Sequence, residues 1–162
     1  MSNTTYFWQG GNKIEVVQDA AAITIHADNP EDAHAMANRA GVQLLAAQPA
    51  ANGLVRATVN LASRDEVVDS LRANDAVVHH VYRDQAGNGN EYMITESFFL
   101  KFLPDTDVDA IRDYLAQENL VVERDLGDKC FLVRVTTATG RNPIRCANAA
   151  ASRPDVMYAE PN

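Results

Sequence analysis

The chain has 162 residues, of which 46% are hydrophobic, and this is enough for one ordinary domain or two small ones with packed cores. Its 22 acidic residues outnumber its 14 basic residues, and the formal net charge is −8 at pH 7. Because phosphate contacts need clustered lysine and arginine, this charge argues against nucleic acid as a partner.

The N-terminal residues contain no charged region followed by an apolar stretch, and no window approaches the roughly 18 apolar residues of a membrane span. We therefore expect no membrane partner and a cytoplasmic location. The two cysteines, Cys130 and Cys146, occur without a Cys-x-x-Cys pair or nearby histidines. A disulfide or zinc framework is therefore not expected.

The first expected element is a β-hairpin within residues 1–21. Gly10 and Gly11 are a two-residue turn signal between an aromatic segment and an alternating one. Aromatic side chains supply much of the area buried in protein cores, so we expect Phe7 or Trp8 to pack against the sheet that follows.

Residues 22–84 are expected to form a first unit with the element order β-α-β-β-α-β. The first helix has Asn29 as its cap and Pro30 in its first turn. Ser63 and Glu66 form a capping-box pattern at the start of the second helix. The expected strands are 22–27, 42–47, 54–61 and 77–82, and the expected helices are 30–40 and 64–74.

The polar segment 85–91 contains two glycines and Asn-Gly turn chemistry, and we expect it to link two halves. Residues 92–162 then repeat the order β-α-β-β-α-β, with a nearly constant separation between corresponding elements. The expected strands are 92–103, 120–125, 130–136 and 156–160, and the expected helices are 106–118 and 143–152. The repetition predicts an α+β protein of tandem ferredoxin-like β-α-β-β-α-β sandwiches with antiparallel sheets, preceded by the N-terminal β-hairpin.

Signals for catalysis are weak throughout the chain. His79 and His80 are adjacent in an expected strand, so their side chains point to opposite faces and cannot share a metal or a proton. We expect one of them to face inward and the other to be solvated. No serine lies in a Gly-x-Ser-x-Gly frame, and both cysteines are expected to be small buried side chains. We therefore expect no catalytic residue and no cofactor in this chain.

Asp105, Asp107 and Asp109 alternate as they do at the start of a calcium-binding loop. The sixth and twelfth positions of that loop are Ala110 and Ala116, where glycine and glutamate are needed. Asp107 and Asp109 are instead expected at the start of a helix, where carboxylates interact favourably with the helix dipole. No metal site is predicted.

The most specific segment is residues 152–162, with the sequence Ser-Arg-Pro-Asp-Val-Met-Tyr-Ala-Glu-Pro-Asn. It resembles the end of the propeptides of subtilisin-like serine proteases, in which a helix precedes an Arg-Pro-Asp-Val-type turn and a Tyr-Ala-Glu-Pro-Asn-type strand. Residues 98–102 and 121–135 resemble the first strand and central hairpin of the same propeptides, so the match spans residues 97–162. The N-terminal hairpin and first unit resemble the N-terminal extension of some larger bacterial subtilases.

This resemblance implies that the chain is the non-catalytic propeptide of a subtilisin-like serine endopeptidase. Such a propeptide is a folding chaperone and an autoinhibitor until autoprocessing and release, and the catalytic domain would follow Asn162. That catalytic domain is the implied partner, covalently joined before processing and bound non-covalently afterwards.

Inhibition would use strand addition, in which the last residues leave the sheet and lie in the protease cleft. The residues implied to bind the cleft are Tyr158, Ala159, Glu160, Pro161 and Asn162. The sheet face implied to meet the protease surface carries Phe99, Lys101, Leu132 and Arg134.

Two other functions stay open. The chain could be a stand-alone protease inhibitor of the same fold that acts in trans on a separate protease. It could also be a tandem regulatory module that binds a small ligand between its two sandwiches, because a fold of this kind does not identify a function by itself.

Overall fold

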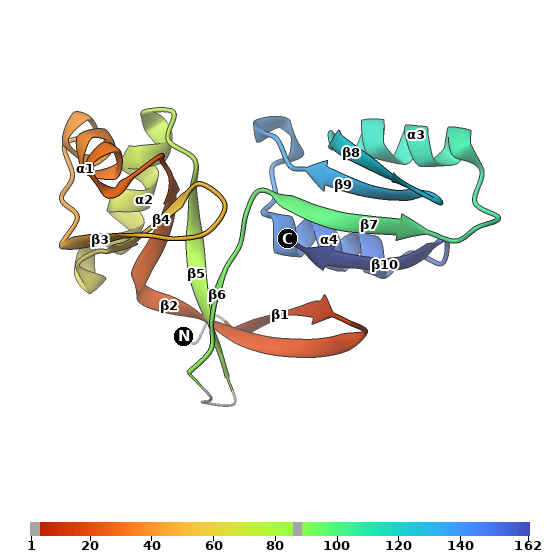
Figure 1. Ribbon diagram of the computed structural model, residues 1–162, viewed down its shortest axis with the longest axis horizontal. Coiled ribbons are helices and arrows are strands. Elements are labelled where there is room, and N and C mark those ends of the chain that lie inside the picture. Colours follow the sequence, from red (N-terminus) through yellow and green to blue (C-terminus); the bar gives the residue numbers. More distant parts are fainter. Residues whose placement is uncertain (1–3, 86–88) are drawn as a thin grey trace. The chain divides into compact units, whose positions relative to one another are not determined.

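The computed structural model describes residues 4–85 and 89–162. These residues form an α+β protein with four helices and ten strands in two antiparallel sheets (Figure 1). The predicted α+β class with antiparallel sheets is confirmed. Contacts divide the chain into two compact units: the first contains residues 17–93, and the second contains residues 5–16 together with residues 94–162.

The first unit has a sheet with the strand order β3-β4-β2-β5-β6, and β1 also pairs with β2. The strands of this sheet are β1 (Thr4–Gln9), β2 (Asn12–His26), β3 (Ala46–Pro49), β4 (Leu54–Thr58), β5 (Val78–Asp84) and β6 (Glu91–Met93). The helices of the first unit are α1 (Pro30–Arg39) and α2 (Arg64–Ala73), with a 3-10 turn at Leu61–Ser63 before α2. The core cluster joins both helices to the inner face of β2 and β4 through Ala33, Leu71, Ile23, Ile25 and Val55.

The capping residue predicted from the sequence is the one observed at the start of α1, but not at the start of α2. The Asn29 side chain caps α1 by accepting a bond from the Asp32 amide at 2.9 Å, as the sequence predicts. The predicted capping box at Ser63 is wrong, because within residues 4–85 Ser63 makes no side-chain capping bond. Asn60 accepts from the Ala62 amide at 2.9 Å instead, and so starts the 3-10 turn that leads into α2.

The described residues of the expected linker 85–91, namely 85 and 89–91, lie within the first unit. β6 pairs with β5 through Val81–Met93, Tyr82–Tyr92 and Arg83–Glu91, so the chain turns back on the first sheet before it reaches residue 94. Residues 86–88 of the expected linker lie outside the described residues. The predicted long strand 92–103 is therefore two strands in two different sheets, and residues 94–96 lie between them.

The second unit has a sheet with the order β10-β7-β9-β8. Its strands are β7 (Ser97–Phe102), β8 (Val121–Gly127), β9 (Cys130–Arg134) and β10 (Val156–Pro161), its helices are α3 (Val108–Gln117) and α4 (Pro143–Ala151), and a 3-10 turn occupies Thr137–Thr139. In both units the first strand of the β-α-β-β-α-β series lies between the third and the fourth, so each β-α-β crossover is split by an intervening strand.

Helices α3 and α4 cover one face of the second sheet (Figure 1). Phe98, Leu100 and Phe102 of β7 are completely buried on that face, and Phe102 makes an edge-to-face contact with Tyr114 of α3 at 6.1 Å between ring centroids. The Asn142 side chain caps α4 by accepting from the Arg145 amide at 2.9 Å. No helix in residues 4–85 or 89–162 has the length and apolar character needed to cross a membrane.

The N-terminal hairpin belongs with the second unit, whereas the sequence predicted packing on the first sheet. Residues 5–16 have their contacts there, and the Asn148 side chain of α4 donates to the Tyr6 carbonyl at 2.7 Å. The reason is the length of β2, a strand of 15 residues whose beginning lies in the second unit and whose end lies in the first. The strand 22–27 expected for the first unit overlaps only the last five residues of β2, 22–26.

Candidate functional site

The second sheet has one face covered by its helices and one opposite face, which we call the open face. Alternation along β7 places Phe98, Leu100 and Phe102 on the covered face, so Ser97, Phe99 and Lys101 point to the open face. An antiparallel register aligns Phe99 with Leu132 of β9, Lys101 with Cys130, and Ser97 with Arg134.

All four sheet residues singled out from the sequence therefore lie on this open face. Leu132 is buried at 8% exposure, whereas Phe99, Lys101 and Arg134 are half-buried. Because the side-chain period of a strand is two, the sequence pattern is sufficient to group residues of one strand. The register that brings two strands together is a tertiary property.

The C-terminal strand β10 adds two more side chains to the open face. Tyr158 is opposite Lys101 and Glu160 is opposite Phe99, while Ala159 is opposite Leu100 and completely buried on the covered face. A register shift between Val156 and Tyr158 interrupts the alternation, and Met157 is 50% exposed there. The open face therefore runs across β10, β7 and β9 without a break.

A hydrogen-bond contact crosses the open face from β9 to β10, over the strand β7 that lies between them. The Cys130 sulfur and the Tyr158 hydroxyl oxygen are 3.5 Å apart. This contact, together with burial, raises the pKa of Tyr158 to about 12. The phenol is therefore a neutral group at any ordinary pH, and it offers a partner an amphipathic ring.

Ser97, Glu123 and Arg134 form a polar cluster at one end of the open face. The Ser97 hydroxyl donates to Glu123 Oε2 at 2.6 Å, and Arg134 Nε lies 3.2 Å from Glu123 Oε1. The cluster ties β7, β8 and β9 together. Sequence reasoning missed Ser97 and Glu123, although the alternation of β7 could have grouped Ser97 with Phe99.

The five residues implied to bind a protease cleft all lie in or directly after the edge strand β10. Its pairing with β7 continues to the end of the strand, where Pro161 is opposite Phe98. The Asn162 amide then donates to the Ser97 carbonyl at 3.1 Å, and its own carbonyl accepts from the Thr95 hydroxyl at 3.1 Å. With no partner present these residues are held in the sheet, because β7 satisfies one side of their main chain.

The Arg-Pro-Asp-Val turn that contributes to the resemblance has a structural explanation. Arg153 donates two hydrogen bonds to the Asp155 carboxylate at 2.9 and 2.8 Å, and this lowers the pKa of Asp155. The Arg153 guanidinium also lies 4.3 Å from the centroid of the Tyr114 ring. The turn is therefore attached to α3 where the chain enters β10.

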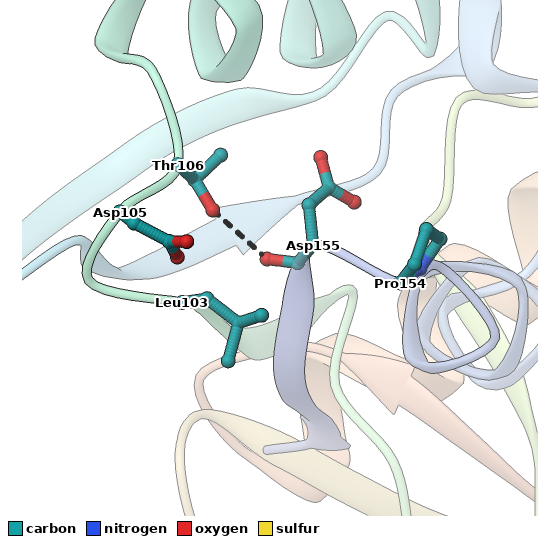
Figure 2. Close-up of a pocket in the computed structure, with 5 residues that line it drawn as sticks. All are labelled: Leu103, Asp105, Thr106, Pro154 and Asp155. Carbon is teal, nitrogen blue, oxygen red and sulfur yellow. Dashed lines mark hydrogen bonds between the residues drawn. The ribbon is translucent and has the colours of Figure 1, made fainter.

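The same turn borders an open pocket of about 250 Å³ that Figure 2 shows. Its lining consists of Leu103, Asp105, Thr106, Pro154 and Asp155, and the Thr106 hydroxyl donates to the Asp155 carbonyl at 3.2 Å.

Residues 4–85 and 89–162 contain no group of three or more His, Cys, Asp or Glu side chains that could hold a metal ion. Asp107 caps α3 through the Asp109 amide at 2.8 Å, which is the structural role predicted for these carboxylates.

The adjacent histidines are both half-buried, so the expectation of one inward and one solvated side chain is wrong. His80 Nδ1 is buried and makes no hydrogen bond within the described part of the chain. Burial and the neighbouring guanidinium groups of Arg64 and Arg72 lower the pKa of His80 to about 4. His80 is therefore a neutral packing group at pH 7.

Exposed apolar residues are found at both edges of the second sheet. Val121, Val122 and Leu126 of β8 are 41–43% exposed, and Met157 and Tyr158 of β10 are 50% and 37% exposed. Apolar side chains on edge strands beside an open face are typical of a surface that binds another protein.

No known family model matches this chain, and no curated protein matches it either.

Proposed function

We propose that this chain is the propeptide of a subtilisin-like serine endopeptidase, a folding chaperone and autoinhibitor whose second unit binds the catalytic domain. The observation that carries the proposal is the continuity of the open face with β10. The side chains of Tyr158 and Glu160 extend the surface formed by Phe99, Lys101, Leu132 and Arg134, so one partner can contact both sets.

The described contacts support a division of roles within the second unit. On the open face, the half-buried Phe99 ring and the Tyr158 ring, which is 37% exposed, supply apolar area for a partner, while the edge of β10 supplies main-chain donors and acceptors. Ala159 anchors the strand in the core and is not free to enter a cleft without unfolding that part of the sheet. Within the proposal, Pro161 and Asn162 leave β7 and enter the protease cleft, while Ala159 stays in the core. The last residues then exchange their pairing with β7 for bonds to the protease.

The test is inhibition of a subtilisin by the purified chain, measured with a chromogenic peptide substrate. Truncating the last four residues would remove buried Ala159 and confuse loss of fold with loss of binding. The sharper variants are Tyr158→Ala, Met157→Ala and a chain without Asn162, with the folded state checked by circular dichroism. The matched control is Leu45→Ala, an apolar side chain in the first unit that is 59% exposed.

We expect the intact chain to inhibit, and we expect the Tyr158 variant to inhibit about ten-fold or more weakly, as for a central aromatic contact. The Leu45 control should inhibit as well as the intact chain. Absence of inhibition by the intact folded chain, or equal potency of all variants, would contradict the proposal.

A further inference from the structure

The N-terminal hairpin and the C-terminal strand meet in the second unit, although they are at opposite ends of the sequence. The Gly11 amide donates to Glu160 Oε1 of β10 at 3.4 Å. The side-chain Nδ2 of Asn148 on α4 donates to the Tyr6 carbonyl at 2.7 Å. The first contact is at the turn of the hairpin and the second is in its first strand, so two separate points hold residues 5–16 to the second unit.

The hairpin has the internal contacts of an ordered element. Tyr6 and Trp8 form an edge-to-face pair at 6.4 Å, and the Lys13 ammonium lies 4.6 Å from the centroid of the Tyr6 ring. Gly10 and Gly11 have φ of 56° and 77°, the left-handed values that a two-residue hairpin turn requires. Because the hairpin is ordered internally, its contact with Glu160 restrains β10 and is not lost to motion within the hairpin.

β10 is the strand of the second sheet for which an added restraint has the largest effect. It is an edge strand, so its main-chain ladder bonds go to β7 alone in the sheet formed by the described residues. The register shift beside Met157 interrupts that ladder near its start. Edge strands with interrupted ladders are among the first parts of a protein to open locally.

We infer that residues 5–16 are a latch on β10, which holds the last strand in its sheet and sets how readily residues 158–162 separate from β7. The latch itself follows from the contacts of Glu160 and Asn148. Its effect on inhibition rests on the proposed function, because a protease would have to compete with the latch for the end of the chain.

The experiment is hydrogen exchange of the full chain, followed at the Asn162 amide and in the peptide 156–162. The variants are Glu160→Ala, which removes the acceptor for Gly11, and Asn148→Ala, which removes the donor to Tyr6. The control is Asn74→Ala, which removes an asparagine bond of the same kind, to the Ser70 carbonyl at 2.9 Å, in the first unit.

We expect each latch variant to speed exchange in 156–162 by about three- to ten-fold, which is the effect of losing one hydrogen bond, while Leu100 in the middle of the sheet keeps its protection. The Asn74 control should leave exchange in 156–162 unchanged. Unchanged exchange in both latch variants would overturn the inference. An equal increase at Leu100 would also overturn it, because the contacts would then stabilise the whole unit and not the strand.

The inhibition assay separates this inference from the proposed function. If the intact chain does not inhibit a subtilisin but the latch variants speed exchange, the proposed function fails and the latch stands. If the intact chain inhibits and exchange in 156–162 is the same in all variants, the latch fails and the proposed function stands.

Discussion

The two units share an order of elements and a strand order, yet the faces of their sheets that lie away from the helices differ in chemistry. In the first unit an ion-pair network joins four strands, with Asp19 on β2, Arg56 on β4, Arg83 on β5 and Glu91 on β6. In the second unit the open face carries Phe99, Leu132 and Tyr158 at the positions described above.

Both arrangements stabilise a sheet, but they leave different surfaces. Hydrogen bonds from the Ala21 amide and Arg83 outweigh the effect of burial and lower the pKa of Asp19. The Asp19 carboxylate therefore already has its hydrogen-bond partners within its own sheet. The Phe99 and Tyr158 rings of the open face keep accessible apolar area, and covering that area with a partner would gain free energy. The comparison favours the second unit over the first as the one that binds the partner proposed above.

The largest expected effect tests whether the units unfold separately. Phe98→Ala removes a completely buried ring from the second core and should lower the free energy of unfolding of that unit by about 3–5 kcal/mol. Ile25→Ala should lower that of the first unit by about 2–5 kcal/mol. Urea unfolding followed by the fluorescence of Trp8, the single tryptophan, reports on the second unit, and an NMR signal of His34 on α1 reports on the first.

Each substitution should shift the probe of its own unit and leave the other midpoint in place. A common shift of both probes in either variant would show that the two units are one cooperative body, and the comparison between them would lose its basis.

The next effect is the pH dependence that His80 gives to the first unit. An unfolded histidine has a pKa of about 6.5, whereas that of folded His80 is about 4, so between these values the unfolded state binds more protons. The contribution of His80 to the stability of the first unit should therefore be constant above about pH 7 and fall by roughly 1–2 kcal/mol on acidification to about pH 4, after allowance for partial exposure of the ring.

The measurement is the urea midpoint of the first unit at several pH values in the intact chain and in His80→Gln. The variant should lose most of the slope that belongs to His80, while His34→Gln, a change at an exposed position on α1, should keep it. An identical pH dependence in the intact chain and His80→Gln would refute this explanation.

The smallest expected effect concerns the turn that leads into β10. Arg153→Ala removes a two-bond pair with Asp155 and the contact with the Tyr114 ring, and should lower the free energy of unfolding of the second unit by about 1 kcal/mol. The control Arg112→Ala breaks an exposed pair with Asp109 and should cost less than about 0.5 kcal/mol. Urea unfolding at neutral pH measures both, and equal losses would show that the turn is ordinary surface.

Local signals in the sequence were enough for most of the fold. The asparagine caps at Asn29 and Asn142 and the proline that follows each of them mark the start of α1 and α4, because a helix end depends on residues next to it. Alternation along β7 grouped Phe99 with Lys101, because side chains on one strand alternate regardless of what lies across the sheet.

The candidate site was only partly predictable, since several of its contacts join residues far apart in the sequence. Nothing near Glu123 indicates that it accepts a bond from Ser97, and nothing near Cys130 indicates Tyr158. The break between β6 and β7 was missed for the same reason. One apolar-rich run supplied strands to two sheets, and strand pairing depends on partners elsewhere in the chain.

The sequence by itself determined the α+β class, the repeated order of elements and the residues that share a face of each strand, because these follow from side-chain periodicity and local capping. Tertiary structure alone decided that residues 5–16 join the second unit and that the pairing with β7 continues beyond the predicted strand 156–160 to Pro161 and Asn162. Both depend on long-range bonds, from Asn148 to Tyr6 and from Asn162 to Ser97, that no local pattern specifies.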